Sequence, residues 1–209
     1  MKEQEDINPY SFFDALFVVD RIGKVLGNAT LLEVHLFTYL ACLLALYRGQ
    51  PVGEWGYFFV GTKMGAPYSR EIEAAVTSSV HKGFLKDLNS GFILTEEGTA
   101  EIQLLGDLSQ NKLKQVYLEA SCSMLLAFPV GIIREALFNE PGLKATVSLS
   151  ATRALLTGAP LELLYEHFSK LSQAVGVEIE DLMIPAAVWV TYLSRISLSD
   201  IENPEGGVS

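Results

Sequence analysis

Residues 81–98 of this chain, HKGFLKDLNSGFILTEEG, contain its most informative structural pattern. Gly83 follows a helical segment and can adopt the left-handed conformation that ends a helix. Residues 84–88 and 92–94 read as two short strands, and Asn-Ser-Gly at 89–91 supplies residue types that tolerate positive φ in a hairpin turn. Thr95 can cap a following helix. The stretch therefore predicts the end of a helix, a hairpin and the start of another helix.

Helical patterns extend outward from this hairpin. We expect helices over residues 69–82, capped by Ser69, and from residue 95 to 105. Upstream, Asn8-Pro9 indicates an extended entry into a helix over 12–26, and a second helix over 31–47 starts with a capping box of Thr30 and Glu33. Residues 51–60 form a short connection and an aromatic run, for which a strand and a short helix are both open.

This order of elements resembles the winged-helix superfamily. The resemblance lies in residues 69–105, where the helix before the hairpin corresponds to the recognition helix, the hairpin to the wing, and Thr95-Glu96-Glu97-Gly98 to the corner after the second wing strand. It implies a mainly α (α+β) fold, with a winged-helix domain over residues 1–108 that carries a two-stranded wing.

The second half of the chain is almost entirely helical by pattern. We expect helices over 110–128, broken by Pro129, over 132–138, closed by residues 139–142, and over 161–175 and 184–196. Residues 150–156 form a further short piece, and 177–181 a connector. We expect residues 109–200 to form a C-terminal helical bundle packed on the winged helix, and residues 201–209 to be a disordered tail.

Composition and charge bear on the class of partner. The net charge is −10, which is unfavourable for a protein that must neutralise phosphates, although a local basic patch could override it. Apolar residues make up 49% of the chain, which leaves open either apolar surface for a partner or simply a well-filled core. The acidic start is unlike a secretory signal, and the longest apolar stretch, 31–47, contains Glu33 and His35. We expect a cytoplasmic protein that does not enter a membrane.

The sequence contains no recognisable catalytic or cofactor motif. His35, His81 and His167 lie far apart, and Cys42 and Cys122 each sit alone in an apolar run. Residues 61–65 resemble a phosphate-binding loop only faintly, because they lack its glycine spacing and its Lys-Ser/Thr pair. Acidic pairs at predicted helix starts are explained by the helix dipole. We therefore expect a non-enzymatic protein with no metal and no cofactor.

Two groups of residues are candidates for binding. Weak candidates for nucleic-acid contact are the basic residues in and around the presumed recognition helix, Lys63, Arg70, Lys82 and Lys86. Glu71 and Glu73 would oppose phosphates there, and a solvated helix face explains the basic residues equally well. Candidates for partner binding are aromatic side chains of the kind that anchor interfaces: Trp55, Tyr57, Phe58 and Tyr68. The alternative is a second core cluster beneath the wing.

A closer resemblance suggests a biological role. The stretches HLFTYLACLLALYRGQPVGEWGYFF, GAPYSREIEAAVTSSVHKGFL and LTEEG look like the small middle components of bacterial three-component ABC-ATPase defence systems such as Lamassu. The resemblance implies an adaptor that binds a coiled-coil, SMC-like ATPase and an effector subunit in antiviral or anti-plasmid defence. A dimeric winged-helix transcriptional regulator is the alternative, and an enzyme with an unrecognised site is a weaker third option.

Overall fold

The computed structural model describes residues 7–176 and 181–202, the side chains of the last six excepted, and is mainly helical. The described chain forms two compact units. Unit 1 contains residues 7–60 and 67–122, and unit 2 contains residues 61–66 and those from 123 onward. The boundary predicted at residue 108 is therefore misplaced, because the helix that follows it belongs to unit 1. Residues 177–180 of the connector predicted at 177–181 lie outside the described residues, as do residues 203–209 of the tail predicted at 201–209. Residues 201 and 202 of that predicted tail are instead the end of the last helix.

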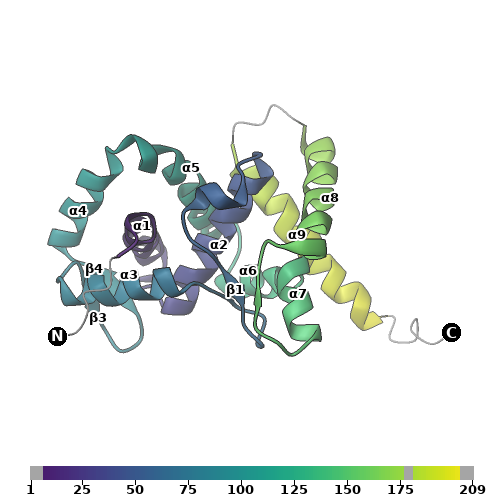
Figure 1. Cartoon of the computed structure of the whole chain (residues 1–209), viewed down its shortest axis with the longest axis horizontal. Coiled ribbons are helices and arrows are strands. Elements are labelled where there is room, and N and C mark those ends of the chain that lie inside the picture. Colours follow the sequence, from purple (N-terminus) through teal and green to yellow (C-terminus); the bar gives the residue numbers. More distant parts are fainter. Residues whose placement is uncertain (1–6, 177–180, 203–209) are drawn as a thin grey trace. The chain divides into compact units, whose positions relative to one another are not determined.

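Unit 1 is built around the helix α1, which Figure 1 shows nearly end-on with α3 and α4 beside it. Every residue of α1 from Ser11 to Val19 is buried, as is every residue of α2 from Val34 to Leu46. Helices that are apolar on nearly all sides belong in the interior. The elements of unit 1 are α1 (Pro9–Leu26), α2 (Leu31–Tyr47), the 3-10 turn η1 (Val52–Trp55), β2 (Pro67–Tyr68), α3 (Arg70–His81), β3 (Leu85–Asp87), β4 (Phe92–Leu94), α4 (Glu96–Gly106) and α5 (Ser109–Ser123).

The helix starts follow from local capping. The Thr30 side chain accepts from the Glu33 amide, and the Glu33 carboxylate accepts from the Thr30 amide at 2.7 Å, which confirms the predicted capping box. The extended entry predicted at Asn8-Pro9 is wrong for Pro9, which is the first residue of α1. Proline is favoured there because its missing N–H would have no partner in any case. Asn8 is the N-cap and accepts from the amides of Tyr10 and Ser11.

The predicted hairpin is present as β3 and β4, paired antiparallel with Leu85 opposite Leu94 and Asp87 opposite Phe92. Asn89 has φ of 65°, as the turn chemistry requires. An isolated bridge joins Ala29, between α1 and α2, to Phe92. The Thr95 hydroxyl donates to the Gly83 carbonyl at 2.7 Å and accepts from the Gly98 amide at 3.0 Å, so one side chain holds both ends of the hairpin and caps α4.

Unit 2 is a set of helices with very little strand. Its elements after residue 123 are η2 (Met124–Leu126), α6 (Val130–Leu137), α7 (Pro141–Ser148), β5 (Arg153–Ala154), α8 (Gly158–Val175) and α9 (Met183–Glu202). The short strand β1 (Val60–Gly61), whose Gly61 belongs to unit 2, is hydrogen-bonded to β5. The Thr146 hydroxyl lies 3.2 Å from the Thr62 carbonyl, which ties the segment 61–66 to α7.

Helix α7 corrects one sequence-based expectation. The helix before residues 139–142 ends as predicted, at Leu137, but Pro141 also starts a new helix, α7, where it again occupies a first-turn position. Glu140 is the cap, and its carboxylate oxygens accept from the Gly142 and Leu143 amides at 3.0 and 2.8 Å. Glutamate is not a preferred N-cap residue, so the sequence rules that favour Ser, Thr, Asp and Asn missed this start.

Candidate functional site: an aromatic depression around Lys114

The site begins with a lock between the start of α1 and the turn after η1. The side-chain amide of Asn8 donates through Nδ2 to the Gly56 carbonyl at 2.8 Å. Gly56 has φ of 94°, and a Cβ at this position would lie 2.6 Å from the Tyr10 ring. Glycine is thus needed both for the backbone conformation and for the close approach of the ring. The lock fixes the two neighbours of Gly56, Trp55 and Tyr57, relative to α1.

Tyr57 and Lys114 both meet Asp14, which is fully buried in α1. The Tyr57 hydroxyl donates to Asp14 Oδ2 at 2.7 Å, and Lys114 Nζ of α5 lies 2.6 Å from the same oxygen. These residues are 43 and 100 positions from Asp14 in the sequence. The cluster therefore joins α1, the segment after η1 and α5 through one carboxylate oxygen.

Aromatic rings surround the lysine ammonium group. Lys114 Nζ lies 4.2 Å from the centre of the Trp55 ring, 4.8 Å from that of Tyr57 and 5.1 Å from that of Tyr10. A cation within about 6 Å of a ring centre is attracted by the ring's negative face, most strongly once it is desolvated. Three rings and one carboxylate thus replace the water that a buried ammonium group loses.

The electrostatics of the cluster follow from its burial. Burial raises the pKa of Asp14 and lowers the pKa of Lys114, and in each case the charge of the other residue opposes the shift. Burial also raises the pKa of Tyr57, so its hydroxyl keeps the proton that it donates. Ring faces favour a cation, and two donors on one oxygen favour a carboxylate. We therefore assign Asp14 and Lys114 as an ion pair.

The rings around Lys114 border a depression of about 150 Å³ on the surface of unit 1. Its walls combine aromatic rings from α1, η1 and α5 with the partly exposed side chain of Leu113, and its rim is polar. The lining residues are Tyr10, Ala45, Gln50, Glu54, Trp55, Gln110, Leu113, Lys114 and Tyr117. Four of them, Gln110, Leu113, Lys114 and Tyr117, recur at helical spacing, so α5 turns one face toward the depression.

The structure separates the aromatic candidates for partner binding. Trp55 and Tyr57 are each only 4% exposed, so the expectation that they stand at the surface as anchors is wrong. They are buried because they enclose Lys114, although Trp55 still lines the depression. Phe58 is 71% exposed. Tyr68 is half-buried, and its hydroxyl donates to Glu73 at 2.6 Å.

Sequence reasoning missed Asp14 and Lys114. The available signal was an aspartate in the middle of the apolar run 12–19, since a charged residue at a buried helical position needs a partner. The lysine could not be found in the same way. Its neighbours Leu113 and Val116 are both exposed, so their apolar character does not mark the buried face of α5.

The four basic candidates for nucleic-acid contact do not lie in one unit. Arg70, Lys82 and Lys86 are exposed in unit 1, whereas Lys63 belongs to the segment 61–66 of unit 2. The ammonium group of Lys82 lies over the ring of Phe12, 5.1 Å from its centre. Exposed acidic residues alternate with the basic ones, Glu73 on α3 and Asp87 on β3.

Three other kinds of site, for a metal ion, a reactive thiol or a membrane, depend on the described residues. Within them, no three His, Cys, Asp or Glu side chains gather in a way that could hold a metal ion. Cys42 and Cys122 are buried free thiols, and burial raises the pKa of Cys122 to about 12. No single described helix has the length and apolar content of a membrane span, although the bent pair Ser109–Leu126 with Val130–Leu137 passes the same test of length and composition.

The chain was compared with known proteins by sequence and by structure. No protein family, no curated protein and no solved structure matches it.

Proposed function

We propose that this chain is a non-catalytic adaptor subunit that binds a larger protein through the depression of unit 1. The observation that carries the proposal is the apolar and aromatic lining of this depression, together with its polar rim. The buried cation in it, Lys114, already has Asp14 as its counter-ion. Interface hot spots have this composition, a well-packed centre enclosed by groups that exclude water.

The size and chemistry of the depression indicate what enters it. A cavity of about 150 Å³ is large enough for a benzene molecule, and hence for one aromatic or branched aliphatic side chain. Lys114 already occupies the ring faces, so a second cation is disfavoured.

The surface around the depression also bears on the partner. Leu113 and Val116, three residues apart on α5, are each 51% exposed and extend the apolar surface beside the depression. With a net charge of −10, the chain favours a partner whose surrounding surface is basic.

Unit 1 is interpreted as a winged-helix domain. In support, α1, the Ala29 bridge, α2, α3 and the β3–β4 hairpin follow the order expected of that fold, with α3 as the helix before the wing. The sequence resemblance to the middle components of Lamassu-type systems leads us to propose an SMC-like coiled-coil ATPase and an effector subunit as partners. The chain would then bridge these two proteins in antiphage or anti-plasmid defence.

Affinity purification with a surface substitution tests this proposal. We expect the tagged full-length chain, expressed in its native host, to retain a coiled-coil ATPase, and Leu113→Glu to reduce its recovery by about tenfold or more. Leu104→Glu is the matched control, an exposed leucine on α4 that does not line the depression. Equal recovery with both variants, or purification of the chain alone, would contradict the proposal.

A dimeric winged-helix transcriptional regulator is the second candidate. It is favoured by the exposure of Arg70 on α3 and of Lys82 and Lys86 near the wing. The exposed carboxylates of Glu73 on α3 and Asp87 on β3 weaken this alternative, because they would repel phosphates. Binding to duplex DNA at low salt, with affinity falling steeply as salt rises, would support the regulator over the adaptor.

A further inference from the structure

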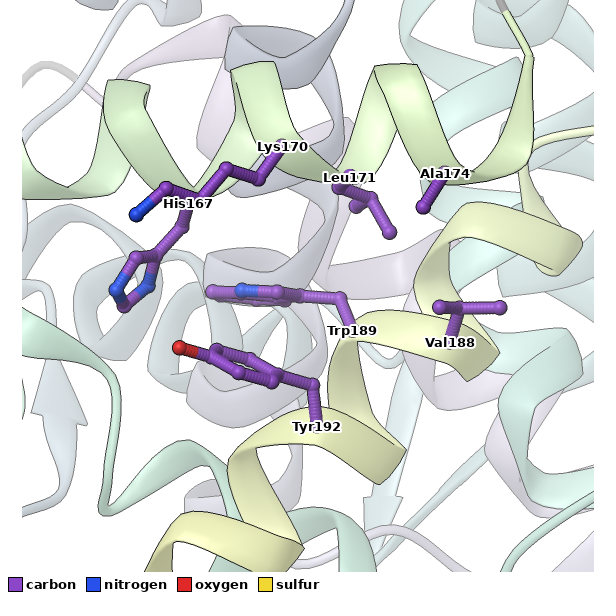
Figure 2. A pocket seen from close by; sticks show the side chains of 7 residues that line it. All are labelled: His167, Lys170, Leu171, Ala174, Val188, Trp189 and Tyr192. Atoms are coloured by element: carbon purple, nitrogen blue, oxygen red, sulfur yellow. The ribbon is translucent and has the colours of Figure 1, made fainter.

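Unit 2 contains a second hollow that is independent of the proposed adaptor function. It is a pocket of about 200 Å³ between α8 and α9, lined almost entirely by apolar surface. Figure 2 shows the side chains that enclose it. Small-molecule sites are concave and mostly apolar, with a few well-placed polar groups. At about 200 Å³, this pocket is smaller than the roughly 300–1,000 Å³ typical of such sites, so it can hold only a small ligand.

Packed rings hold the wall of the pocket in place. Trp189 of α9 is 2% exposed and meets Phe168 of α8 edge-on, with ring centres 5.4 Å apart. His167 of α8 meets Tyr192 of α9 in the same way, at 5.5 Å and an interplanar angle of 85°. Since each pair joins the two helices, the pocket belongs to a defined packing arrangement within unit 2.

The two ends of the pocket differ in chemistry. Figure 2 shows the polar tips of His167, Lys170 and Tyr192 at one end, and Ala174 and Val188 at the other. Among the described residues, no aspartate or glutamate lines the pocket, so the positive charge of Lys170 has no counter-ion there. The pocket therefore offers one cation above an otherwise apolar hollow.

Two buried nitrogen atoms also lack partners. Within the described structure, Nδ1 of His167 and Nε1 of Trp189 are buried and make no hydrogen bond. Buried polar atoms in proteins are nearly always hydrogen-bonded, so an unpartnered pair beside one hollow calls for an explanation. The indole N–H can only donate, and it therefore requires an acceptor.

We propose that this pocket binds a small organic monocarboxylate with an aromatic or short aliphatic body. The carboxylate pairs with the Lys170 ammonium group and accepts hydrogen bonds from the polar groups around it. The apolar body lies against Leu171, Ala174 and Val188. Burial lowers the pKa of His167, as does the nearby charge of Lys170, so the imidazole is neutral and Lys170 is the cation that selects the ligand. Glu166, next in sequence to His167, is exposed and does not line the pocket, and its charge only partly opposes this lowering of the His167 pKa.

Calorimetric titration of the full chain tests this inference. The probes are 3-phenylpropionate, octanoate and the neutral 3-phenylpropionamide. We expect saturable binding of at least one carboxylate and binding of the amide that is weaker by about fivefold, as for a partly exposed ion pair. Lys170→Gln should remove this preference, whereas Lys63→Gln, at an exposed lysine outside the pocket, should keep it.

A blocking substitution locates the site. Ala174→Phe fills the pocket from α8 and should abolish binding, while Gln173→Phe, on the adjacent exposed position of α8, should not change it. Thermal unfolding checks that both variants are folded. The inference is overturned if no probe binds at millimolar concentration, if the amide binds as well as the carboxylate, or if both phenylalanine variants bind equally. None of these outcomes affects recovery of the ATPase, so the two proposals fail separately.

Discussion

Unit 1 and unit 2 each place a lysine beside aromatic rings, with opposite results. In unit 1, the side chain of Lys114 is 8% exposed, three rings surround it and Asp14 balances its charge. In unit 2, Lys170 is exposed at the edge of a pocket walled by Trp189 and Tyr192, and no described carboxylate lines that pocket.

The difference lies in whether the chain itself supplies the anion. Where Asp14 is present, rings and lysine form an internal anchor that joins three segments of unit 1, and only a shallow depression remains for a partner. Where no carboxylate is present, the same residue types leave a cation and an apolar hollow that a ligand can complete. The following predictions test this contrast, from the largest expected effect to the smallest.

Removing the cation from unit 1 should have the largest effect. Lys114→Met leaves Asp14 buried without its counter-ion, and we expect the free energy of unfolding to fall by about 3–5 kcal/mol. The double variant Asp14→Leu/Lys114→Met should recover most of this loss, because an apolar pair can replace a buried ion pair. Urea denaturation measures both. Lys112→Met, an exposed change on the same helix, should lie within about 0.5 kcal/mol of the parent.

Acid should weaken unit 1 through His35. Its Nδ1 accepts from the Ser69 amide at 3.3 Å, and burial lowers the pKa of His35 to about 4, partly opposed by the charge of Glu73. Between its ordinary pKa of 6.5 and about pH 4, the unfolded chain binds a proton that the folded chain does not. The stability contributed by neutral His35 is therefore complete above pH 6.5. It decreases as the pH falls from 6.5 to about 4, by roughly 3 kcal/mol in total.

A histidine substitution isolates this contribution. His35→Asn keeps an acceptor near the Ser69 amide but cannot titrate, so its stability should fall less steeply over the same pH range. Urea denaturation at several pH values compares the two slopes, and other groups cancel because they titrate in both proteins. Parallel curves would show that His35 does not carry the effect.

The lock beside the depression should be sensitive to a single methyl group. Gly56→Ala places a Cβ against the Tyr10 ring and forces a non-glycine residue to φ of 94°. We expect a loss of about 1–3 kcal/mol. Gly23→Ala, inside α1 with open space around the new Cβ, should instead stabilise the fold by about 0.5–1 kcal/mol. Thermal unfolding measures both, and equal shifts would argue against the lock.

The smallest effect is expected at His167 in unit 2. His167→Phe removes a buried nitrogen that has no partner, and we expect stability to change by less than about 1 kcal/mol. His35→Phe in unit 1 removes an acceptor that is in use and should cost about 1–3 kcal/mol. Chemical denaturation at neutral pH compares them, and a larger loss at His167 would reverse the contrast.

Much of unit 1 could be predicted because its signals are local. The capping box of Thr30 and Glu33, the stop at Gly83 and the hairpin turn each depend on residues within four positions of one another. The start of α7 was missed because Glu140 is an uncommon cap, and the proline after it was read only as the end of a helix.

The site itself could not be predicted from local pattern. Asp14 and Lys114 are 100 residues apart, and only tertiary packing brings them together. The sequence marks Trp55 and Tyr57 as candidates for partner binding. Their aromatic side chains fit a surface anchor and a buried enclosure for a cation equally well. The pocket of unit 2 depends on ring pairs between two helices, and periodicity alone does not predict which faces of these helices meet.

Site-specific photo-crosslinking tests the central claim, that the depression of unit 1 receives a partner protein. A benzophenone-bearing amino acid would replace Gln110, an exposed residue at the rim, or Thr99, an exposed residue on α4 outside it. We predict that position 110 crosslinks to the coiled-coil ATPase in the native host and that position 99 does not. Crosslinking from neither position, or from position 99 alone, would contradict the adaptor function assigned to this depression.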